Sequence, residues 1–228
     1  MKRFSGRVSL ASVLAVGATL IAPPMQLSAA QGTLASLCRF VAAAVAPAAA
    51  AAEECPAPVA GSVTGETGSI KRVALTDLID AYSGVSGVSW QHQLFSNLSS
   101  KPQACSHFRN NQVVANEKWL VLTQVAARDD MQDAPFATGT YQIGIGTTDP
   151  TGTLRTATAM YAPKGRSCAS GGEPNASAGS ITYTTVTDTL VEGTYDLWFG
   201  SDHVTGTFSA PHCTLCAPRP DTQTCLKA

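Results

Sequence analysis

The sequence predicts an all-β protein, an antiparallel β-sandwich stabilised by disulfides, with an open barrel as the alternative. Several segments alternate apolar and polar residues with a period of two, the pattern of half-buried strands. Turn signals separate these segments, and helical periodicity is almost absent, as in sandwiches and barrels. Only 14% of the 228 residues are charged, against about 25% in typical soluble proteins. The abundant threonine that replaces these charges favours strands.

The first 30 residues have the three-part pattern of a secretory signal peptide. A basic stretch, MKRFSGR, precedes the apolar run VSLASVLAVGATLIA, and Ser28 and Ala30 occupy the −3 and −1 positions of a cleavage site. The apolar run is shorter than the roughly 20 residues that a membrane span requires. We therefore expect export to the periplasm, the cell surface or the medium, with no transmembrane segment in the mature chain.

An Ala/Pro-rich linker is expected over residues 31–66, followed by a β-sandwich domain over 67–216 and a C-terminal tail over 217–228. As an alternative, the signal extends to residue 52, with Met25 as the start and FVAAAVAPA as its apolar run. A lipid anchor at Cys38 is a minor alternative, because Leu37 stands where a lipoprotein box has a small residue.

Removal of residues 1–52 makes the chain acidic. It leaves 11 bases and 16 acids, a net charge of −5. Because contacts with phosphates require a cationic face, this charge argues against nucleic acid as a partner. A ligand of the envelope or cell surface is the expected kind of partner.

Six cysteines remain after processing, and an even number in an oxidising compartment predicts three disulfides. We expect Cys105 and Cys168 to pair with Cys213 and Cys216 in either order, and Cys55 with Cys225. The CTLC segment at 213–216 follows a strand and precedes two prolines, whereas redox cysteines of this spacing begin a helix. A structural role is therefore favoured over a redox role and over a zinc site with His212.

The predicted elements follow in order along the chain. A first strand is expected within 69–79, and residues 77–94 are ambiguous, with room for one short helix. Residues 117–127 predict a central strand covered on both faces, because apolar residues are consecutive there. Residues 139–162 predict a hairpin around the turn TTDPTG, and 179–193 predict a further strand after a long polar loop.

The segment GTYDLWFGSDHVTGTFSAPHC, residues 193–213, predicts a hairpin with a four-residue loop at 200–203. In this register Phe199 pairs with Val204, Leu197 with Gly206 and Tyr195 with Phe208. The apolar faces of both strands then coincide, and a slip by one residue would expose one of them.

The sequence offers no catalytic residue, cofactor site or metal site that stands out by its pattern. It has no G-x-S-x-G elbow, no H-E-x-x-H pair and no phosphate-binding loop. Aromatic and imidazole side chains in predicted loops are the binding candidates, because loops often bear function. These candidates are Trp90, His92, Trp198, Asp202 and His203.

Residues 135–213 combine a Gly-Thr-Tyr strand (GTYQIGI), a loop cysteine at 168 and the ending GTYDLWFGSDHVTGTFSAPHC. This combination resembles a group of uncharacterised bacterial exported proteins, many of them lipoproteins, with the motif GT(F/Y)DL…VTGTFxAPxC. The resemblance implies an all-β exported domain and no particular activity. This chain departs from the group by its added Cys216 and Cys225 and by its poor lipoprotein box.

The expected function is that of an exported envelope protein, a non-catalytic binding or structural module. The alternative is a small secreted hydrolase-type enzyme with its site in loops 86–112, 163–178 or 200–203. An enzyme would bring an acid and a base from separate loops to one end of the sandwich. A binding module would instead show an exposed aromatic patch, for which Trp90 and Trp198 are the candidates.

Overall fold

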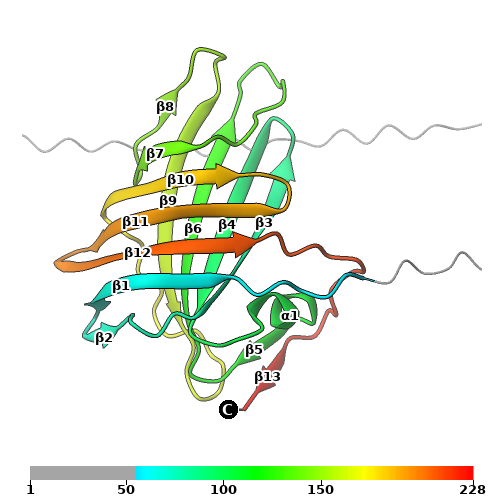
Figure 1. The fold of residues 1–228 in the computed structure, drawn as a ribbon, viewed down its shortest axis with the longest axis vertical. Coiled ribbons are helices and arrows are strands. Elements are labelled where there is room, and N and C mark those ends of the chain that lie inside the picture. The colour runs from blue at the N-terminus through cyan, green and yellow to red at the C-terminus, as the bar shows by residue number, and fades with distance from the viewer. Residues whose placement is uncertain (1–54, 228) are drawn as a thin grey trace, which may run out of the picture. The chain divides into compact units, whose positions relative to one another are not determined.

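The computed structural model describes residues 55–227, so the expected signal peptide, Cys38 and the linker as far as residue 54 lie outside the described residues. Residues 55–227 form strands and one short helix (Figure 1). The strands are β1 (Ser62–Ile70), β2 (Val73–Ala74), β3 (Asp80–Val88), β4 (Gln91–Ser99), β5 (Gln112–Val114), β6 (Lys118–Ala127), β7 (Gly139–Gln142), β8 (Thr147–Thr148), β9 (Leu154–Pro163), β10 (Ala178–Val186), β11 (Leu190–Phe199), β12 (Asp202–Pro211) and β13 (Thr224–Leu226), and the helix is α1 (Ala104–Arg109).

Two antiparallel sheets form the layers of a sandwich. One has six strands in the order β2-β1-β12-β11-β10-β7, and the other has five in the order β3-β4-β6-β9-β8. Figure 1 shows the first sheet in front, with its long strands running across the view, and the second sheet behind it, with strands running nearly vertically. This is the orthogonal kind of sheet packing. The strand ladders form two sheets, with isolated bridges between them at Ser83–His212 and Ile143–Ala157, and no closed barrel forms, which confirms the predicted sandwich.

The core lies between the layers, where the inward side chains of both sheets meet. Leu120 and Leu122 of the central strand β6 are fully buried between β4 and β9, as the apolar run there predicts. Trp119 and Val121 on the other face of β6 are half-buried. The prediction that both faces of this strand are covered therefore holds fully for the inner face and partly for the outer face.

The outer face of the six-stranded sheet explains the threonine content. Thr64, Thr207, Thr194, Thr182 and Thr140 are direct cross-strand neighbours on β1, β12, β11, β10 and β7. The hydroxyls of Thr140 and Thr182 lie 2.8 Å apart, in hydrogen-bond contact. Cross-strand pairs of this type stabilise a sheet while leaving its face to solvent.

Two expected elements differ from the structure near the start of the sandwich. The first strand, β1, begins at Ser62, inside the range expected for the linker, and the range 69–79 holds only the end of β1 and the short β2. Residues 77–94 hold most of the β3–β4 hairpin and no helix. The helix within residues 55–227 is α1, and it carries Cys105 inside the loop that was expected over 86–112.

Residues 139–162 do not form a single hairpin. Strand β7 pairs with β10 in one sheet, whereas β8 pairs with β9 in the other. The chain therefore changes layers at residues 143–146, a device that orthogonal sandwiches use at their corners. The period-two pattern predicted the strands but carries no information about which sheet each one joins.

The β11–β12 hairpin has the predicted faces but a different register. Phe199 pairs with Asp202, Leu197 with Val204 and Tyr195 with Gly206, so the loop is Gly200-Ser201 alone. A shift by two residues keeps every side chain on its face, so hydrophobic patterning could not distinguish the two registers. The two-residue loop relies on Gly200, whose φ is +71°, a conformation that suits glycine.

Three disulfides join the described cysteines: Cys55–Cys216, Cys105–Cys213 and Cys168–Cys225. The expectation that Cys105 pairs with Cys213 or Cys216 is correct, while the pairing of Cys168 with that region and of Cys55 with Cys225 is wrong. Cys225 lies in β13, which pairs in parallel with β5, so the expected C-terminal tail contains a strand that is attached to the rest of the fold. No helix among residues 55–227 is long and apolar enough to cross a membrane.

Candidate functional site

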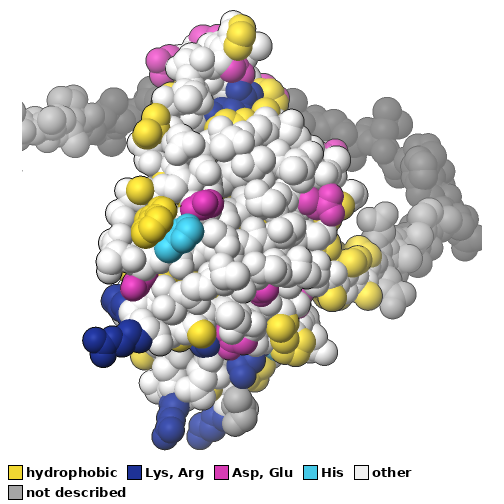
Figure 2. All heavy atoms as spheres, turned by 60° about the vertical axis from the view of Figure 1, so that its left-hand side comes forward, with side chains coloured by type: hydrophobic (Ala, Val, Ile, Leu, Met, Phe, Trp, Pro, Cys, Tyr) yellow, Lys and Arg dark blue, Asp and Glu magenta, His cyan; other side chains and the backbone are white. Residues whose placement is uncertain are grey.

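The predicted binding residues Trp198 and His203 lie together on the outer face of the β11–β12 hairpin. Their rings stack with centroids 4.2 Å apart and planes inclined by 13°. Nε2 of His203 is 2.7 Å from Oδ1 of Asp196. Figure 2 views this side of the molecule, where an imidazole lies between a hydrophobic side chain and a carboxylate on a surface of mostly uncharged groups. Trp198 is 41% exposed, whereas Trp90 is half-buried in the turn between β3 and β4 of the other sheet.

Asp202 has a structural contact and does not belong to that patch. Its Oδ2 accepts a hydrogen bond of 2.7 Å from the backbone N–H of Lys71. Lys71 and Arg72 form the β1–β2 turn with positive φ angles of 50° and 65°. The carboxylate therefore holds this turn against the start of β12, which is the turn-stabilising role that aspartate often has.

Trp90 and His92 belong to the β3–β4 hairpin on the other sheet. The His92 ring stacks on Phe136 with 4.3 Å between centroids, and its Nε2 contacts the carbonyl oxygen of Ala134. His92 and Phe136 line a cavity of about 440 Å³, together with Asp188 and His212 from two further segments. An acid and two imidazoles thus meet at one cavity, but none of these side chains is hydrogen-bonded to another among the described residues.

A second hollow lies on the outer face of the five-stranded sheet, a part of the molecule with no predicted binding residue. Tyr82, Asn97, Val121 and Met160 are cross-strand neighbours on β3, β4, β6 and β9 and all line it. Trp119, two residues before Val121, points to the same face. We call this hollow the aromatic groove; its volume is about 230 Å³, and its other lining residues are Phe108, Gln112, Val113, Ala162, Lys164, Glu173, Arg219 and Gln223.

Aromatic rings build the floor of the groove. The Tyr82 ring contacts Phe108 at 5.0 Å and Trp119 at 5.9 Å between centroids, the latter in an edge-to-face arrangement at 87°. Tyr82 is only 4% exposed, whereas Trp119 is half-buried and presents part of its ring to the groove. Edge-to-face contacts of this kind fix the orientation of each ring, so the platform is pre-formed.

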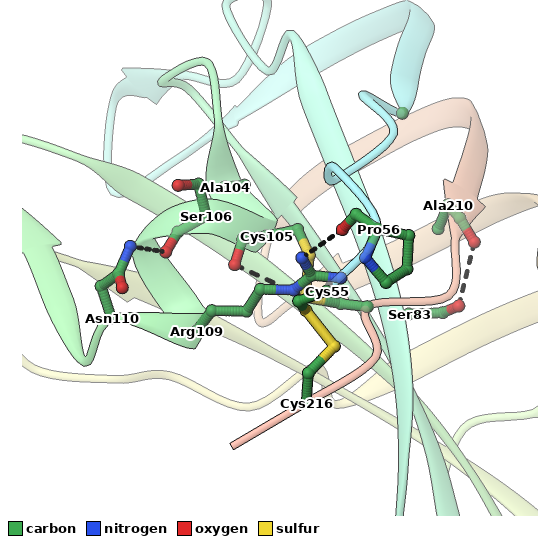
Figure 3. The surroundings of a disulfide bond; sticks show 12 residues. Cys55, Pro56, Ser83, Ala104, Cys105, Ser106, Arg109, Asn110, Ala210 and Cys216 are labelled. Atoms are coloured by element: carbon green, nitrogen blue, oxygen red, sulfur yellow. Dashed lines mark hydrogen bonds between the residues drawn. A yellow bond between two sulfur atoms is a disulfide. The ribbon is translucent and has the colours of Figure 1, made fainter. Parts of the chain in front are cut away.

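Helix α1 and the C-terminal segment form one wall. Phe108 comes from α1, and the guanidinium carbon of Arg219 lies 4.3 Å from the centroid of its ring. Nη2 of Arg219 also donates to Oδ1 of Asn111 at 2.7 Å. Figure 3 shows the surroundings of the Cys55–Cys216 disulfide, where Nη1 of Arg109, the last residue of the same helix, donates to the Pro56 carbonyl oxygen.

The loop 163–178 forms the other wall, and a disulfide joins the two walls. Cys168 of this loop is bonded to Cys225 of the C-terminal segment. Nζ of Lys164 lies 3.6 Å from Oε1 of Glu173 and donates to Ser170 Oγ at 2.7 Å. The groove therefore has one paired cation, Lys164, and one cation with no carboxylate beside it among the described residues, Arg219.

A buried carboxyl group supports the sheet end next to the groove. Glu117 is fully buried, and its Oε1 accepts a hydrogen bond of 2.6 Å from Ser99 Oγ, while Oε2 accepts one of 3.2 Å from Val114 N–H. Burial raises the pKa of Glu117, and these two hydrogen bonds oppose that rise. Burial also raises the pKa of Tyr82, so its hydroxyl stays protonated.

Sequence reasoning missed the groove because its residues come from distant segments. Tyr82 lies in a stretch whose secondary structure was ambiguous, and Arg219 lies in the expected C-terminal tail. A disulfide at Cys225 was expected to attach this tail, but the expected partner was Cys55, whereas the structure pairs Cys225 with Cys168 beside the groove. Of the predicted candidates, the structure brings only Trp198 and His203 together.

No family model matches the chain, and the searches found no curated protein and no solved structure similar to it. Among the described residues, no group of three or more His, Cys, Asp or Glu side chains is arranged to hold a metal ion. The interpretation of the site therefore depends on the geometry of the groove and of the His92 cavity.

Proposed function

We propose that this chain is an exported, non-catalytic binding protein of the bacterial envelope, that its ligand site is the aromatic groove, and that its ligand is a saccharide. Three disulfides among the described residues are compatible with an oxidising compartment outside the cytosol. The N-terminal signal pattern and the resemblance of residues 135–213 to exported proteins support the same location.

The single observation that carries the proposal is the half-buried Trp119 ring, which the buried Tyr82 holds edge-to-face among amide side chains. A sugar ring has an apolar C–H face that packs on an aromatic ring and a rim of hydroxyls that need hydrogen-bond partners. Asn97, Gln112 and Gln223 line the groove and offer both donors and acceptors to such a rim. Small-molecule binding sites usually combine an apolar floor with a few polar groups that point into the site.

The size of the groove sets the size of the bound group. Its volume of about 230 Å³ is below the roughly 300–1,000 Å³ of pockets that enclose drug-sized molecules. The groove is also open, so a larger ligand can extend beyond it. We therefore expect one ring of an oligosaccharide to occupy the groove while neighbouring rings remain on the surface.

Binding to an array of neutral and acidic oligosaccharides tests this function. The wild-type protein should bind a subset of them, and Trp119→Ala should weaken that binding by about tenfold or more, because the ring platform is lost. Trp198→Ala is the matched control, since it removes an indole from the other sheet, and it should leave binding unchanged. If Trp198→Ala abolished binding and Trp119→Ala did not, the groove would not be the site.

The His92 cavity favours a second candidate function, hydrolysis. His92, Asp188 and His212 converge from separate segments on one cavity of about 440 Å³, as the enzyme alternative requires. Their side chains lack the mutual hydrogen bonds of a nucleophile–base pair among the described residues, which is why binding is preferred. Hydrolysis of a chromogenic ester by the wild-type protein, abolished in both His92→Ala and His212→Ala, would favour the enzyme.

A further inference from the structure

The geometry points to a more specific ligand: a saccharide that carries a carboxylate, which Arg219 recognises. This inference rests on the proposed function, because it assigns the chemistry of the same groove. It depends on the charge balance of the groove walls, whereas the proposed function depends on its aromatic floor.

Arg219 is held at the groove by contacts that leave its Nη1 donors without a partner among the described residues. Its guanidinium lies over Phe108, and one of its five N–H donors reaches Asn111. Its Nε is buried and has no hydrogen-bond partner among residues 55–227. A guanidinium stacked on an aromatic ring keeps a fixed plane, and its free edge presents donors in the fork geometry that matches a carboxylate.

The charge of the groove favours one negative charge on the ligand. Arg219 takes part in none of the five ion pairs between described residues. Lys164 is paired with Glu173, so the two cations and one carboxylate that line the groove leave one positive charge uncompensated. A carboxylate supplies one negative charge, whereas a phosphate monoester carries about 1.5 to 2. A carboxylate therefore balances the groove better than a phosphate does.

Arg219 is half-buried, so its positive charge interacts more strongly with a bound anion than a fully exposed charge would. A fully solvated cation is screened by water and salt, but a cation in a partly enclosed groove is screened less. Its hydrogen bonds to an ionised group are therefore stronger than those to a neutral hydroxyl. An acidic sugar should therefore bind to the groove more tightly than a neutral sugar of the same shape.

Isothermal titration with two matched probes tests the inference: trigalacturonate and its carboxyl-reduced form, which keeps the ring, the linkage and the hydroxyls. The wild-type protein should bind the acidic probe about tenfold or more tightly than the neutral one. Arg219→Gln should remove that preference: it should lower the affinity for the acidic probe by about tenfold or more and the affinity for the neutral probe by much less. Arg166→Gln is the matched control, because it removes an equal charge from an exposed side chain that does not line the groove.

The outcomes separate this inference from the proposed function. Equal affinity for the two probes, or a preference that survives Arg219→Gln, would overturn the role of Arg219 and leave saccharide binding in place. Loss of the preference in Arg166→Gln would show general electrostatic attraction and would also overturn it. Absence of binding to both probes and to the oligosaccharide array would overturn both proposals. A folded far-UV spectrum of each variant excludes unfolding as the cause.

Discussion

The guanidinium of Arg219 lies 4.3 Å from the centre of the Phe108 ring and thereby attaches the C-terminal segment to helix α1. The contact places a cation beside the Trp119 and Tyr82 rings, which come from the central and edge strands of the five-stranded sheet. Arg219 thus completes a groove on the sheet face that holds Trp119, although the two residues are 100 positions apart in the sequence. The same segment is held at its far end by Cys168–Cys225.

The three disulfides should be reduced in a defined order. Cys105 and Cys213 are each 5% exposed, whereas Cys55, Cys216 and Cys225 are exposed to solvent. Because thiol–disulfide exchange requires access to the sulfur atoms, the Cys55–Cys216 and Cys168–Cys225 bonds should open before Cys105–Cys213. Stepwise reduction with dithiothreitol, alkylation and peptide mass spectrometry measure this order.

Opening of the Cys168–Cys225 bond should also affect the groove, because that bond joins its two walls. The loop it closes spans 57 residues, for which the chain-entropy model gives about 4 kcal/mol of stabilisation. We expect the Cys168→Ala/Cys225→Ala double variant to have a lower unfolding midpoint and weaker saccharide binding. Early reduction of Cys105–Cys213 would contradict the buried position that the structure gives this pair.

Replacement of Tyr183 by phenylalanine should stabilise the folded protein. The side chain is fully buried, and its hydroxyl has no hydrogen-bond partner among the described residues. An unsatisfied buried hydroxyl costs about 1–3 kcal/mol, so Tyr183→Phe should raise the free energy of unfolding by about 1 kcal/mol. Urea denaturation measures the change.

Tyr141→Phe is the matched control for this substitution. The Tyr141 hydroxyl contacts the carbonyl oxygens of Ala137 and Thr138 at 3.2 and 3.1 Å. Its removal should therefore lower the free energy of unfolding, by about 1 kcal/mol for a lost hydrogen bond. A loss of stability in Tyr183→Phe as large as that in Tyr141→Phe would contradict the environment described for the Tyr183 hydroxyl.

The contribution of Glu117 to the free energy of unfolding should decrease as the pH rises. Burial raises the pKa of this carboxyl in the folded state, so between the unfolded and folded pKa values the folded chain binds more protons than the unfolded chain. The contribution of Glu117 is therefore fully present below the unfolded pKa, about 4.3, and is lost as the pH rises through the folded pKa.

The pH dependence of unfolding of Glu117→Gln, followed by urea denaturation between pH 4 and 7, measures this effect. Relative to wild type, the variant should gain stability as the pH increases. Asp129→Asn is the control, because it removes one carboxyl from an exposed side chain that takes part in none of the ion pairs between described residues. A wild-type protein that gained stability relative to Glu117→Gln with rising pH would show that the carboxylate form is the favoured one.

Hydrophobic patterning predicted the sandwich because every second residue of a strand points to the same face, so apolar residues alternate with polar ones along each half-buried strand. Tyr195, Leu197 and Phe199 point inward as expected. The same pattern did not determine the register of the β11–β12 hairpin. Pairing Tyr195 with Gly206 and not with Phe208 shifts the register by two residues, which leaves every side chain on the same face. Close packing selects the observed pairing: Gly206 leaves room for the Tyr195 ring, whose hydroxyl would lie 2.4 Å from a Cβ at that position.

The binding site was harder to predict than the fold because its residues are joined by long-range contacts. Trp198 and His203 were found because they are near neighbours in one hairpin. Trp119 was read only as part of a buried strand, and the segment of Arg219 only as a tail. The β13–β5 pairing and the Cys168–Cys225 bond hold the segment of Arg219 beside the groove. That bond belongs to one of 15 possible connectivities of six cysteines, and sequence alone does not choose among them.

The indole N–H signals of the three tryptophans give the most direct test of the groove as the ligand site. They are assigned in a ¹H–¹⁵N correlation spectrum from Trp90→Phe, Trp119→Phe and Trp198→Phe, and trigalacturonate is then added to the wild-type protein. The Trp119 signal should shift in a saturable manner while those of Trp90 and Trp198 stay in place. A saturable shift of Trp198 with Trp119 unmoved would contradict the account and place the ligand on the opposite sheet.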